Sequence, residues 1–390
     1  MDPRHKISFL GFLVLIIGVS PALCSELGGL EDASGQAREL LKGARTIGAS
    51  SRAQAQAASP ADGTLSYASV CGGDGAALAD RRAQRLMTGL KALEPQLRPR
   101  FAALAAKYGL PAQNGADYID STLRSITYTY PQSVDKAKAA LSAFAEAIEQ
   151  AVLSRVAAPD HARIKAALTS RIQTRSSLSA EAKAALVRRV ELTMLALPSR
   201  YIREYLTTTD ELWPVVSLLA ADQAWNASYD DLGGASNPAL TPDQSLIIVF
   251  PGFLLAEDRG NGSSGVDYVL AHETAHSIDS GRFPGLYRGY IDCMKERNGQ
   301  DFKSWDEVMA DTWAAETLAV LSSSAGAKEL GKSFEIVCGT SGEGADPILG
   351  NLTQSEHPSG QYRIERILAS NADLRHSLGL PPASPAACGL

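Results

Sequence analysis

The segment His272–His276 reads HETAH and combines residue types suited to metal binding and hydrolysis. On a helix, residues four positions apart lie on one face, so His272 and His276 can bind one metal ion together. Two imidazoles at this spacing are typical of tetrahedral zinc sites. Glu273 would point to one side, where its carboxylate can act as a base on a zinc-bound water molecule. We therefore predict one Zn²⁺ ion per chain, with Glu273 as the catalytic base.

A catalytic zinc site needs a third protein ligand and one open position. Glu307 is the candidate, because it lies near the start of a predicted amphipathic helix that extends to about Leu321. Asp311 follows one turn later and would accept the outer N–H of a ligating histidine. Ser304 and Glu307 also fit a capping box, which is a purely structural role. The alternative for the two histidines is an exposed helix face without metal.

Two helices must carry these residues, and the rest of the sequence predicts a mainly α protein with a small β-sheet, an α+β fold. Amphipathic stretches such as Val134–Val156 and Ala180–Leu197, punctuated by prolines, predict a helical lobe at 64–200. The run Ile247–Phe250 predicts a strand. The residues Ser264–Asp267 resemble a capping box that opens the HETAH helix. A catalytic domain would then occupy the remaining chain, 201–390.

The N-terminal residues 1–24 have the basic start and apolar run of a secretory signal peptide. Cys24 raises the alternative of a lipid anchor, which Leu23 disfavours because a small residue is normally found before a lipidated cysteine. Residues 25–63 are expected to be a linker or a poorly ordered segment. No other run is long and apolar enough to span a bilayer, so we expect no transmembrane anchor in a mature, secreted or periplasmic chain.

The composition narrows the choice of partners. A formal net charge of −6 and a sequence pI near 5.6 give no basic stripe, which argues against nucleic acid as a partner. With 390 residues the chain can bury a large core and needs no metal merely to fold. His161, in the helical lobe, is expected to be an ordinary surface or core histidine. Beyond Cys24, four cysteines allow three disulfide pairings: Cys71, Cys293, Cys338 and Cys388.

A HETAH helix followed by a Glu-x-x-x-Asp helix resembles the neprilysin and endothelin-converting-enzyme family of zinc metallopeptidases, in the gluzincin group. Further segments resemble that family in order: Trp225–Tyr229, Ile247–Pro251, Phe334–Thr340 and His357–Arg363. The resemblance covers the C-terminal half strongly and the helical lobe only faintly. It implies a zincin-like catalytic lobe in a short form with a reduced N-terminal lobe.

The resemblance also implies roles for single residues. His357 would stabilise the transition state, and Arg363 would be structural and orient the substrate. Asn226 and Ala227 would hold the substrate main chain, while the strand Ile247–Phe250 would offer an edge to an extended peptide.

The family pattern further implies the disulfide pairs Cys71–Cys338 and Cys293–Cys388. Three apolar residues beside the matched motifs are expected to line a specificity pocket or to belong to the core: Phe253, Val269 and Val337.

The expected function is that of a zinc-dependent endopeptidase acting on extracellular or periplasmic peptides or proteins. One alternative is a catalytically inactive, zinc-retaining binding or scaffold protein of the same fold. Another is hydrolysis of a non-peptide amide or ester.

Overall fold

The computed structural model describes most of the chain from residue 65 onward. The described residues are 65–71, 75–111, 113, 115, 117–130, 133–208, 210, 212–219, 229–233, 243–257, 264–298, 305–325, 333–338, 360–381 and 388. The predicted signal peptide (1–24) and linker (25–63) lie outside them. Residues Ser59–Leu390 form one compact unit. The boundary expected at residue 200 stays a prediction.

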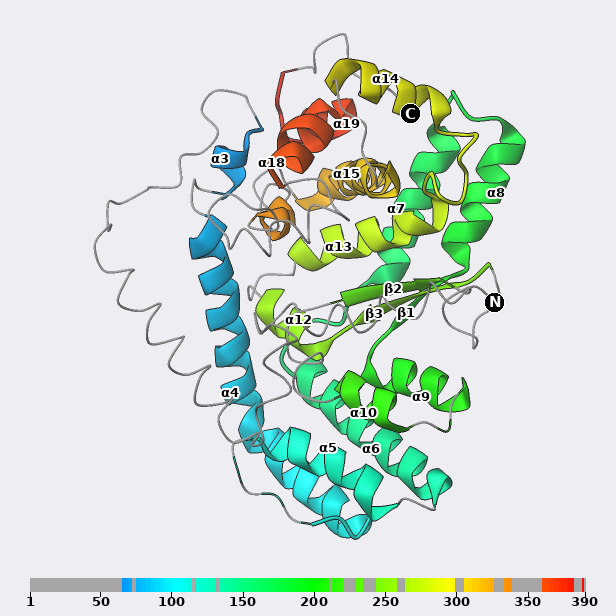
Figure 1. Cartoon of the computed structure of the whole chain (residues 1–390). Helices are drawn as coiled ribbons and strands as arrows, with labels where there is room; N and C mark the ends of the chain where they lie inside the picture. The colour runs from blue at the N-terminus through cyan, green and yellow to red at the C-terminus, as the bar shows by residue number, and fades with distance from the viewer. Residues whose placement is uncertain are drawn as a thin grey trace, which may run out of the picture. The chain divides into compact units, whose positions relative to one another are not determined.

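The described part is mainly helical with a small sheet, as predicted (Figure 1). The first helices are α3 (Tyr67–Cys71), α4 (Gly75–Lys107), α5 (Tyr118–Thr129), α6 (Val134–Leu153), α7 (His161–Thr174), α8 (Ala180–Glu191), α9 (Pro198–Thr208) and α10 (Leu212–Leu219). The later helices are α12 (Pro251–Glu257), α13 (Ser264–Ala275), α14 (Arg288–Asn298), α15 (Trp305–Ala325), α18 (Gly360–Tyr362) and α19 (Ala372–Ser377). Short 3₁₀ turns are η2 (His276–Ile278), η3 (Phe334–Val337) and η5 (Leu368–Ser370), and η4 (Arg363–Ile367) is a π-helical turn.

The sheet has the strand order β1-β3-β2, with β1 (Thr193–Ala196) parallel and β2 (Tyr229–Gly233) antiparallel to β3 (Ser245–Val249). Every residue of β3 is buried. The prediction that the strand Ile247–Phe250 offers an edge to a peptide was wrong, because β3 is paired on both sides. Among the described strands, β1 and β2 form the edges.

The predicted helix Ala180–Leu197 ends early, at Glu191, and its last part forms β1. Thr193–Ala196 pairs in register with Ser245–Ile248 of β3. Pairing with a buried strand satisfies the backbone hydrogen bonds that continuing the helix would otherwise satisfy, so the tertiary contact overrides local helix propensity.

Helix α4 continues through Pro95 and Pro99, although prolines were expected to separate the helical stretches of this lobe. Proline removes a backbone hydrogen bond and kinks a helix, and Figure 1 shows α4 changing direction along its length. Leu93, Leu97 and Phe101 on either side of the prolines are buried. Packing of this apolar face stabilises the kinked helix against termination.

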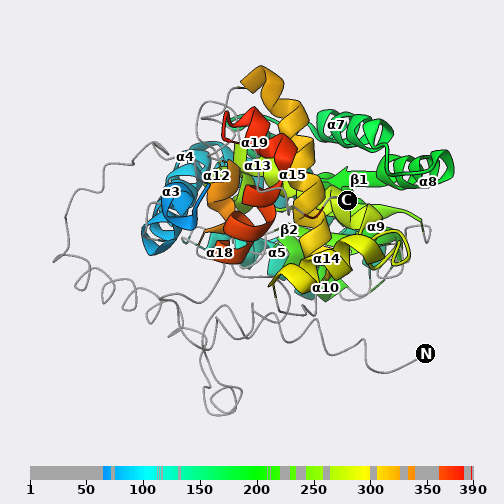
Figure 2. The ribbon, with the colours of Figure 1, turned by 90° about the horizontal axis from the view of Figure 1, so that it is seen from above.

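Figures 1 and 2 both show α13 beside α15. Figure 1 shows these two helices on one side of the sheet and α6, α9 and α10 on the other side. Helix α15 was predicted to be amphipathic, but it is buried on all sides from Val308 to Leu318. Helices α7, α13 and α19 pack around it. A helix that is surrounded in this way has no face exposed to solvent, so its sequence needs no polar stripe.

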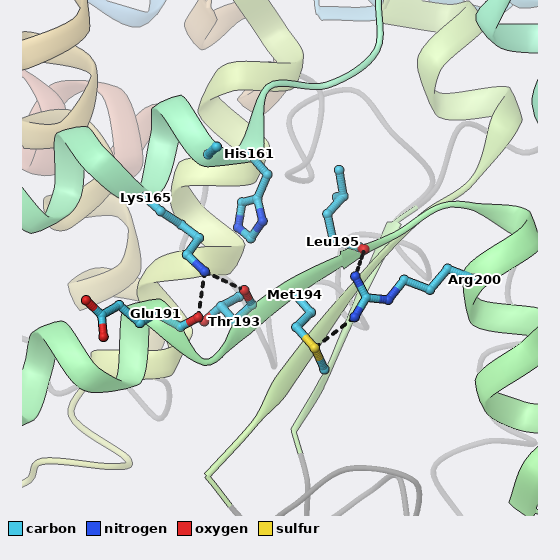
Figure 3. Close-up of a pocket in the computed structure, with 8 residues that line it drawn as sticks. His161, Lys165, Glu191, Thr193, Met194, Leu195 and Arg200 are labelled. Carbon is cyan, nitrogen blue, oxygen red and sulfur yellow. Dashed lines mark hydrogen bonds between the residues drawn. The ribbon is translucent and has the colours of Figure 1, made fainter.

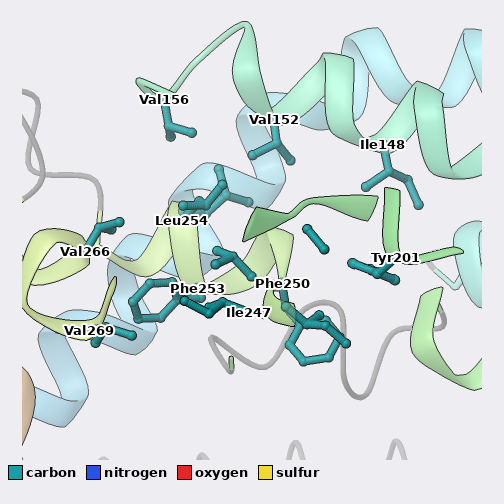
Figure 4. Close-up of a cluster of buried hydrophobic side chains, with 14 of the residues drawn as sticks. Ile148, Val152, Val156, Tyr201, Ile247, Phe250, Phe253, Leu254, Val266 and Val269 are labelled. Carbon is teal, nitrogen blue, oxygen red and sulfur yellow. The ribbon is translucent and has the colours of Figure 1, made fainter. Parts of the chain in front are cut away.

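The main apolar core joins the N-terminal helices to the sheet and to α12 and α13. Figure 4 shows Ile148 of α6, Tyr201 of α9 and Ile247 of β3 in this cluster. Phe253, Val269 and Val337 belong to the same core and are buried. They are core residues, so the alternative of a specificity pocket does not hold for them.

Two disulfide bonds join distant parts of the chain, in the pairs that the family resemblance implied. Cys71–Cys338 ties α3 to the end of η3 across a separation of 267 residues, and Cys293–Cys388 ties α14 to the C-terminal end across 95. Such links typically stabilise a fold by about 2 to 4 kcal/mol each. In the described part of the chain, no helix combines the length and apolar character needed to cross a bilayer.

Truncating a core ring tests this packing. Phe144 of α6 is fully buried, with its ring 4.7 Å from that of Phe101 between centroids. We expect Phe144→Ala to lower the free energy of unfolding by about 3 to 5 kcal/mol, because it leaves a cavity. Chemical denaturation measures the change. Met87→Ala is the control: Met87 is 62% exposed, so its truncation should cost less than about 0.5 kcal/mol. Equal losses in both variants would contradict the described packing of α6.

Candidate metal centre

The three predicted ligands lie together where α13, η2 and α15 meet. His272 lies in the last turn of α13, His276 begins η2, and Glu307 lies in the first turn of α15. One ligand atom from each falls within 4.8 Å of the others. The Nε2 atom of His272 is 3.1 Å from Glu307 Oε2, and that of His276 is 3.6 Å from Glu307 Oε1. Glu307 therefore faces both imidazoles rather than serving only as a helix cap.

The outer nitrogens of both histidines are held by carboxylates. His272 Nδ1 is 2.8 Å from Asp311 Oδ1, and His276 Nδ1 is 3.0 Å from Asp279 Oδ2. An ionised carboxylate only accepts, so in a neutral imidazole the proton sits on Nδ1 and Nε2 carries a lone pair. The two Nε2 atoms lie 3.2 Å apart, next to the Glu307 carboxylate. Three Lewis bases converging in this way fit a divalent cation.

The ionisation states of His272 and Glu307 also favour a cation site. Burial would lower the pKa of His272, but its hydrogen bonds with Asp311 and Glu307 outweigh burial and raise that pKa to about 9. For Glu307, burial would raise the pKa, yet the hydrogen bonds from His272 and His276 hold it far below its usual range. Glu307 is therefore an anion, and a proton and a metal ion compete for the same Nε2 positions.

Access to the cluster is one-sided. The His272 side chain is 1% exposed, whereas those of His276 and Glu307 are 14% and 13% exposed. A fourth ligand such as water would therefore reach the metal position from the side of His276 and Glu307.

Asp311 lies at the centre of a buried network behind His272. Arg363 donates from Nε to Asp311 Oδ2 and from Nη2 to Oδ1, both at 2.7 Å, and the Tyr268 hydroxyl also donates to Oδ1. Burial would raise the pKa of Asp311, but the Arg363 charge and the His272 hydrogen bond outweigh it and keep that pKa low. Arg363 lies in the π-helical turn η4, a local geometry that often occurs at functional sites. The network fixes the orientation of the His272 ring.

Sequence reasoning identified Asp311 and Arg363 but missed Tyr268. A usable signal existed: Tyr268 lies four residues before His272, on the same helix face, and a buried tyrosine hydroxyl needs a partner. Arg363 Nη2 also donates to the Tyr268 hydroxyl at 3.2 Å. The hydroxyl thus links the arginine to the carboxylate.

Asp279 was missed as well. Its Oδ1 accepts the backbone N–H groups of Gly281 and Arg282, at 2.9 and 3.1 Å, which leaves Oδ2 aimed at His276. The Arg282 guanidinium donates from Nε to the backbone oxygen of His276 at 3.0 Å. An aspartate three residues beyond a ligating histidine is the pattern that would have indicated this support.

Glu273 lies beside the three ligands without being one of them. Its side chain is 6% exposed, and its Oε1 is 3.9 Å from His272 Nε2. That distance is too long for a direct hydrogen bond and leaves room for one bridging water.

Three predicted site residues lie outside the described residues: Asn226, Ala227 and His357. Their roles stay predictions. His161 is described and lies away from the ligand cluster. It begins α7, is buried, and its Nε2 lies 3.0 Å from the Thr274 hydroxyl, between the two ligating histidines on the chain. Sequence reasoning expected an ordinary surface or core histidine, and the buried position agrees with the latter.

Comparisons with protein-family models, with curated proteins and with solved structures give no match to this chain. The function proposed below therefore rests on the geometry of the site and on the resemblance of its motifs.

The carboxylate behind His272 should control metal affinity. We expect Asp311→Asn to weaken Zn²⁺ binding about 10- to 100-fold, because the ring loses its anionic partner. Tyr268→Phe removes one hydrogen bond to the same carboxylate and should have a smaller effect in the same direction. Competition with a chelator measures both. Tyr130→Phe, which removes a hydroxyl that donates to the Tyr108 carbonyl oxygen, is the matched control. Unchanged affinity in a folded Asp311→Asn protein would refute the support role.

Acid should destabilise the fold partly through His161. Burial, followed by the charges of Lys165 and Arg200, lowers the pKa of His161 from 6.5 to about 4. Between these two pH values the unfolded chain binds a proton at His161, whereas the folded chain keeps the imidazole neutral. The free energy of unfolding therefore falls by about 3 kcal/mol in total as the pH drops from about 6.5 to about 4.

Denaturation of the metal-free protein at several pH values, with a chelator present, measures this effect. The wild type should lose about 3 kcal/mol more than His161→Gln between pH 6.5 and pH 4. His376→Gln controls for the loss of one exposed histidine and should follow the wild type. Parallel pH profiles for wild type and His161→Gln would disprove the assignment.

Proposed function

We propose that the chain is a zinc-dependent endopeptidase, similar to the neprilysin family, that hydrolyses peptide bonds of extracellular or periplasmic peptides. The observation that carries the proposal is the buried carboxylate of Glu273 beside a cluster of three ligands. Structural zinc sites are usually closed by four protein ligands, whereas catalytic sites use three and keep one position for water or substrate. A purely structural site has no use for a nearby carboxylate that is not one of the metal ligands.

The donor set supports zinc as the metal. Two imidazoles and one carboxylate, from His272, His276 and Glu307, form a ligand combination typical of zinc hydrolases. When bound, Zn²⁺ supplies a Lewis acid that polarises a carbonyl group and lowers the pKa of a coordinated water toward about 7.

Glu273 would perform the proton transfers. A general base must reach the proton it accepts directly or through one water, and the 3.9 Å between its Oε1 and His272 Nε2 suits that arrangement. The carboxylate takes a proton from the attacking water as the new C–O bond forms. It then gives that proton to the amine nitrogen as the C–N bond breaks, so that one peptide and one water yield a carboxylic acid and an amine.

Other residues of the chain would position the reactants. Asp311, Tyr268 and Arg363 hold the His272 ring, so Arg363 acts mainly as a positioning residue. Asn226 and Ala227, proposed to hold the substrate main chain, are separated from the start of β2 by Ser228 alone. Since β2 is an edge of the described sheet, an extended peptide can add to it as a further strand. His357 is proposed to stabilise the oxyanion of the transition state.

The two disulfide bonds support a location outside the reducing cytosol, because structural disulfides persist mainly in oxidising compartments. Extracellular or periplasmic peptides are then the substrates that the enzyme would meet.

Replacing Glu273 tests the mechanism. We expect Glu273→Gln to bind Zn²⁺ as the wild type does and to lose about 100- to 10,000-fold in kcat, because the amide cannot accept the proton. Mass spectrometry of a mixed peptide library measures cleavage, and elemental analysis measures zinc. Glu181→Gln, at an exposed glutamate of α8, is the control and should retain full activity.

Two outcomes would contradict the proposal. A wild-type protein that holds zinc but cleaves no peptide would favour the zinc-retaining binding or scaffold protein. Cleavage that is equal in wild type and Glu273→Gln would exclude Glu273 as the base.

A further inference from the structure

A shallow cavity of about 440 Å³, widely open to solvent, lies beside the edge strand β1, apart from the metal ligands. It is formed by the start of α7, the end of α8, β1 and the first turn of α9 (Figure 3). Its lining residues are His161, Ala162, Lys165, Glu191, Thr193, Met194, Leu195 and Arg200. None of them takes part in the hydrolytic mechanism proposed above.

Two cationic side chains in this cavity are held by uncharged atoms. Lys165 donates from Nζ to the backbone oxygens of Glu191 and Thr193, at 2.6 and 3.0 Å. Arg200 donates from Nη1 to the backbone oxygen of Leu195 at 3.2 Å, and its Nη2 lies 2.8 Å from the sulfur of Met194. These contacts fix the positions of the ammonium and guanidinium groups without supplying a negative charge.

Acidic side chains compensate these charges only weakly. The Glu191 side chain is exposed, and Figure 3 shows its carboxylate directed away from His161 and Arg200. Glu204 lies 3.9 Å from Arg200 Nε, one turn later on α9, in a partly exposed pair that solvent screens. The cavity therefore keeps an excess of positive charge.

His161 reports the same positive potential. Its imidazole is buried, and after burial the charges of Lys165 and Arg200 are the causes that lower its pKa, to about 4. Thr274 donates its hydroxyl hydrogen to the Leu270 backbone oxygen, so His161 Nε2 carries the hydrogen shared with Thr274. A neutral imidazole thus forms one wall, between two cations.

We propose that this cavity binds a small organic molecule through a carboxylate or phosphate group held between Lys165 and Arg200. An oxyanion is complementary in charge to the ammonium and guanidinium groups, and both groups are hydrogen-bond donors. The volume is several times that of one water molecule, which occupies about 30 Å³ in the liquid, so the ligand extends beyond a single inorganic ion. Met194 and Leu195 are the apolar residues of the lining and can contact its remainder.

The imidazole of His161 gives a direct readout, because it lines the cavity and contacts α13 through Thr274. The full-length, metal-loaded protein with isotope-labelled histidine is titrated with sodium phosphate, sodium acetate and N-acetylglycine. Sodium chloride keeps the ionic strength constant. The His161 resonance is assigned with His161→Gln. We expect that resonance to shift until the site is saturated. The anion whose chemistry matches the site should reach saturation at the lowest concentration.

Charge-removing variants locate the site. Lys165→Gln and Arg200→Gln should each weaken binding at least about tenfold, the effect of losing one charge-assisted hydrogen bond. Arg200→Lys keeps the charge without the forked geometry and should weaken binding less. Arg188→Gln removes one positive charge from the exposed face of α8, outside the cavity, and should bind as the wild type does. Circular dichroism verifies that each variant is folded.

The three anions distinguish the ligand chemistry. Tighter binding of N-acetylglycine and acetate than of phosphate supports a carboxylate ligand, and the reverse order supports a phosphate ligand. No saturable shift with any of the three, or equal affinity in wild type and the Lys165→Gln/Arg200→Gln double variant, would overturn the proposal. Both results are independent of peptidase activity, so they leave the proposed function untouched.

Discussion

The buried charge of Asp311 is the constraint on which the metal centre depends. A fully buried carboxylate is tolerated only when partners compensate it, and here Arg363, Tyr268 and His272 all bond to it. Through these contacts one side chain of α15 holds α13 and the turn η4 together. Loss of any partner leaves a poorly compensated charge in the core, so the same interaction that orients a ligand also fixes the packing of three elements.

The rest of the centre follows from that arrangement. With α13 held against α15, the nitrogens of two histidines face the Glu307 carboxylate, and Glu273 lies close by without joining them. A cation at this point binds the folded chain and not the unfolded one, so it should stabilise the contact between the helices by mass action. Disulfide bonds act on the same region from outside, since Cys338 lies beside η3, whose Phe334 packs edge-on against Tyr268.

Much of the site could be predicted from the sequence, because its signals are local. The spacing of HETAH and the four-residue step from Glu307 to Asp311 depend only on the helical period. The disulfide pairs came from the family resemblance, since four cysteines alone leave three pairings open. Predictions failed where packing decided the outcome, as in β1, where a helical pattern yields to strand pairing, and in α4, which continues through two prolines.

By itself, therefore, the sequence determined the mainly helical class, the two ligand helices and the residue types of the candidate centre. Only the tertiary structure decided that β3 is a central strand, that Tyr268 and Asp279 support the ligands, and that Lys165 and Arg200 line one cavity. The physical reason is the sequence separation over which each kind of interaction acts. Helical periodicity links residues a few positions apart, whereas strand pairing, burial and charge compensation join residues far apart, as His161 and Thr274 are, at a separation of 113. Such contacts produce no periodic pattern in the sequence.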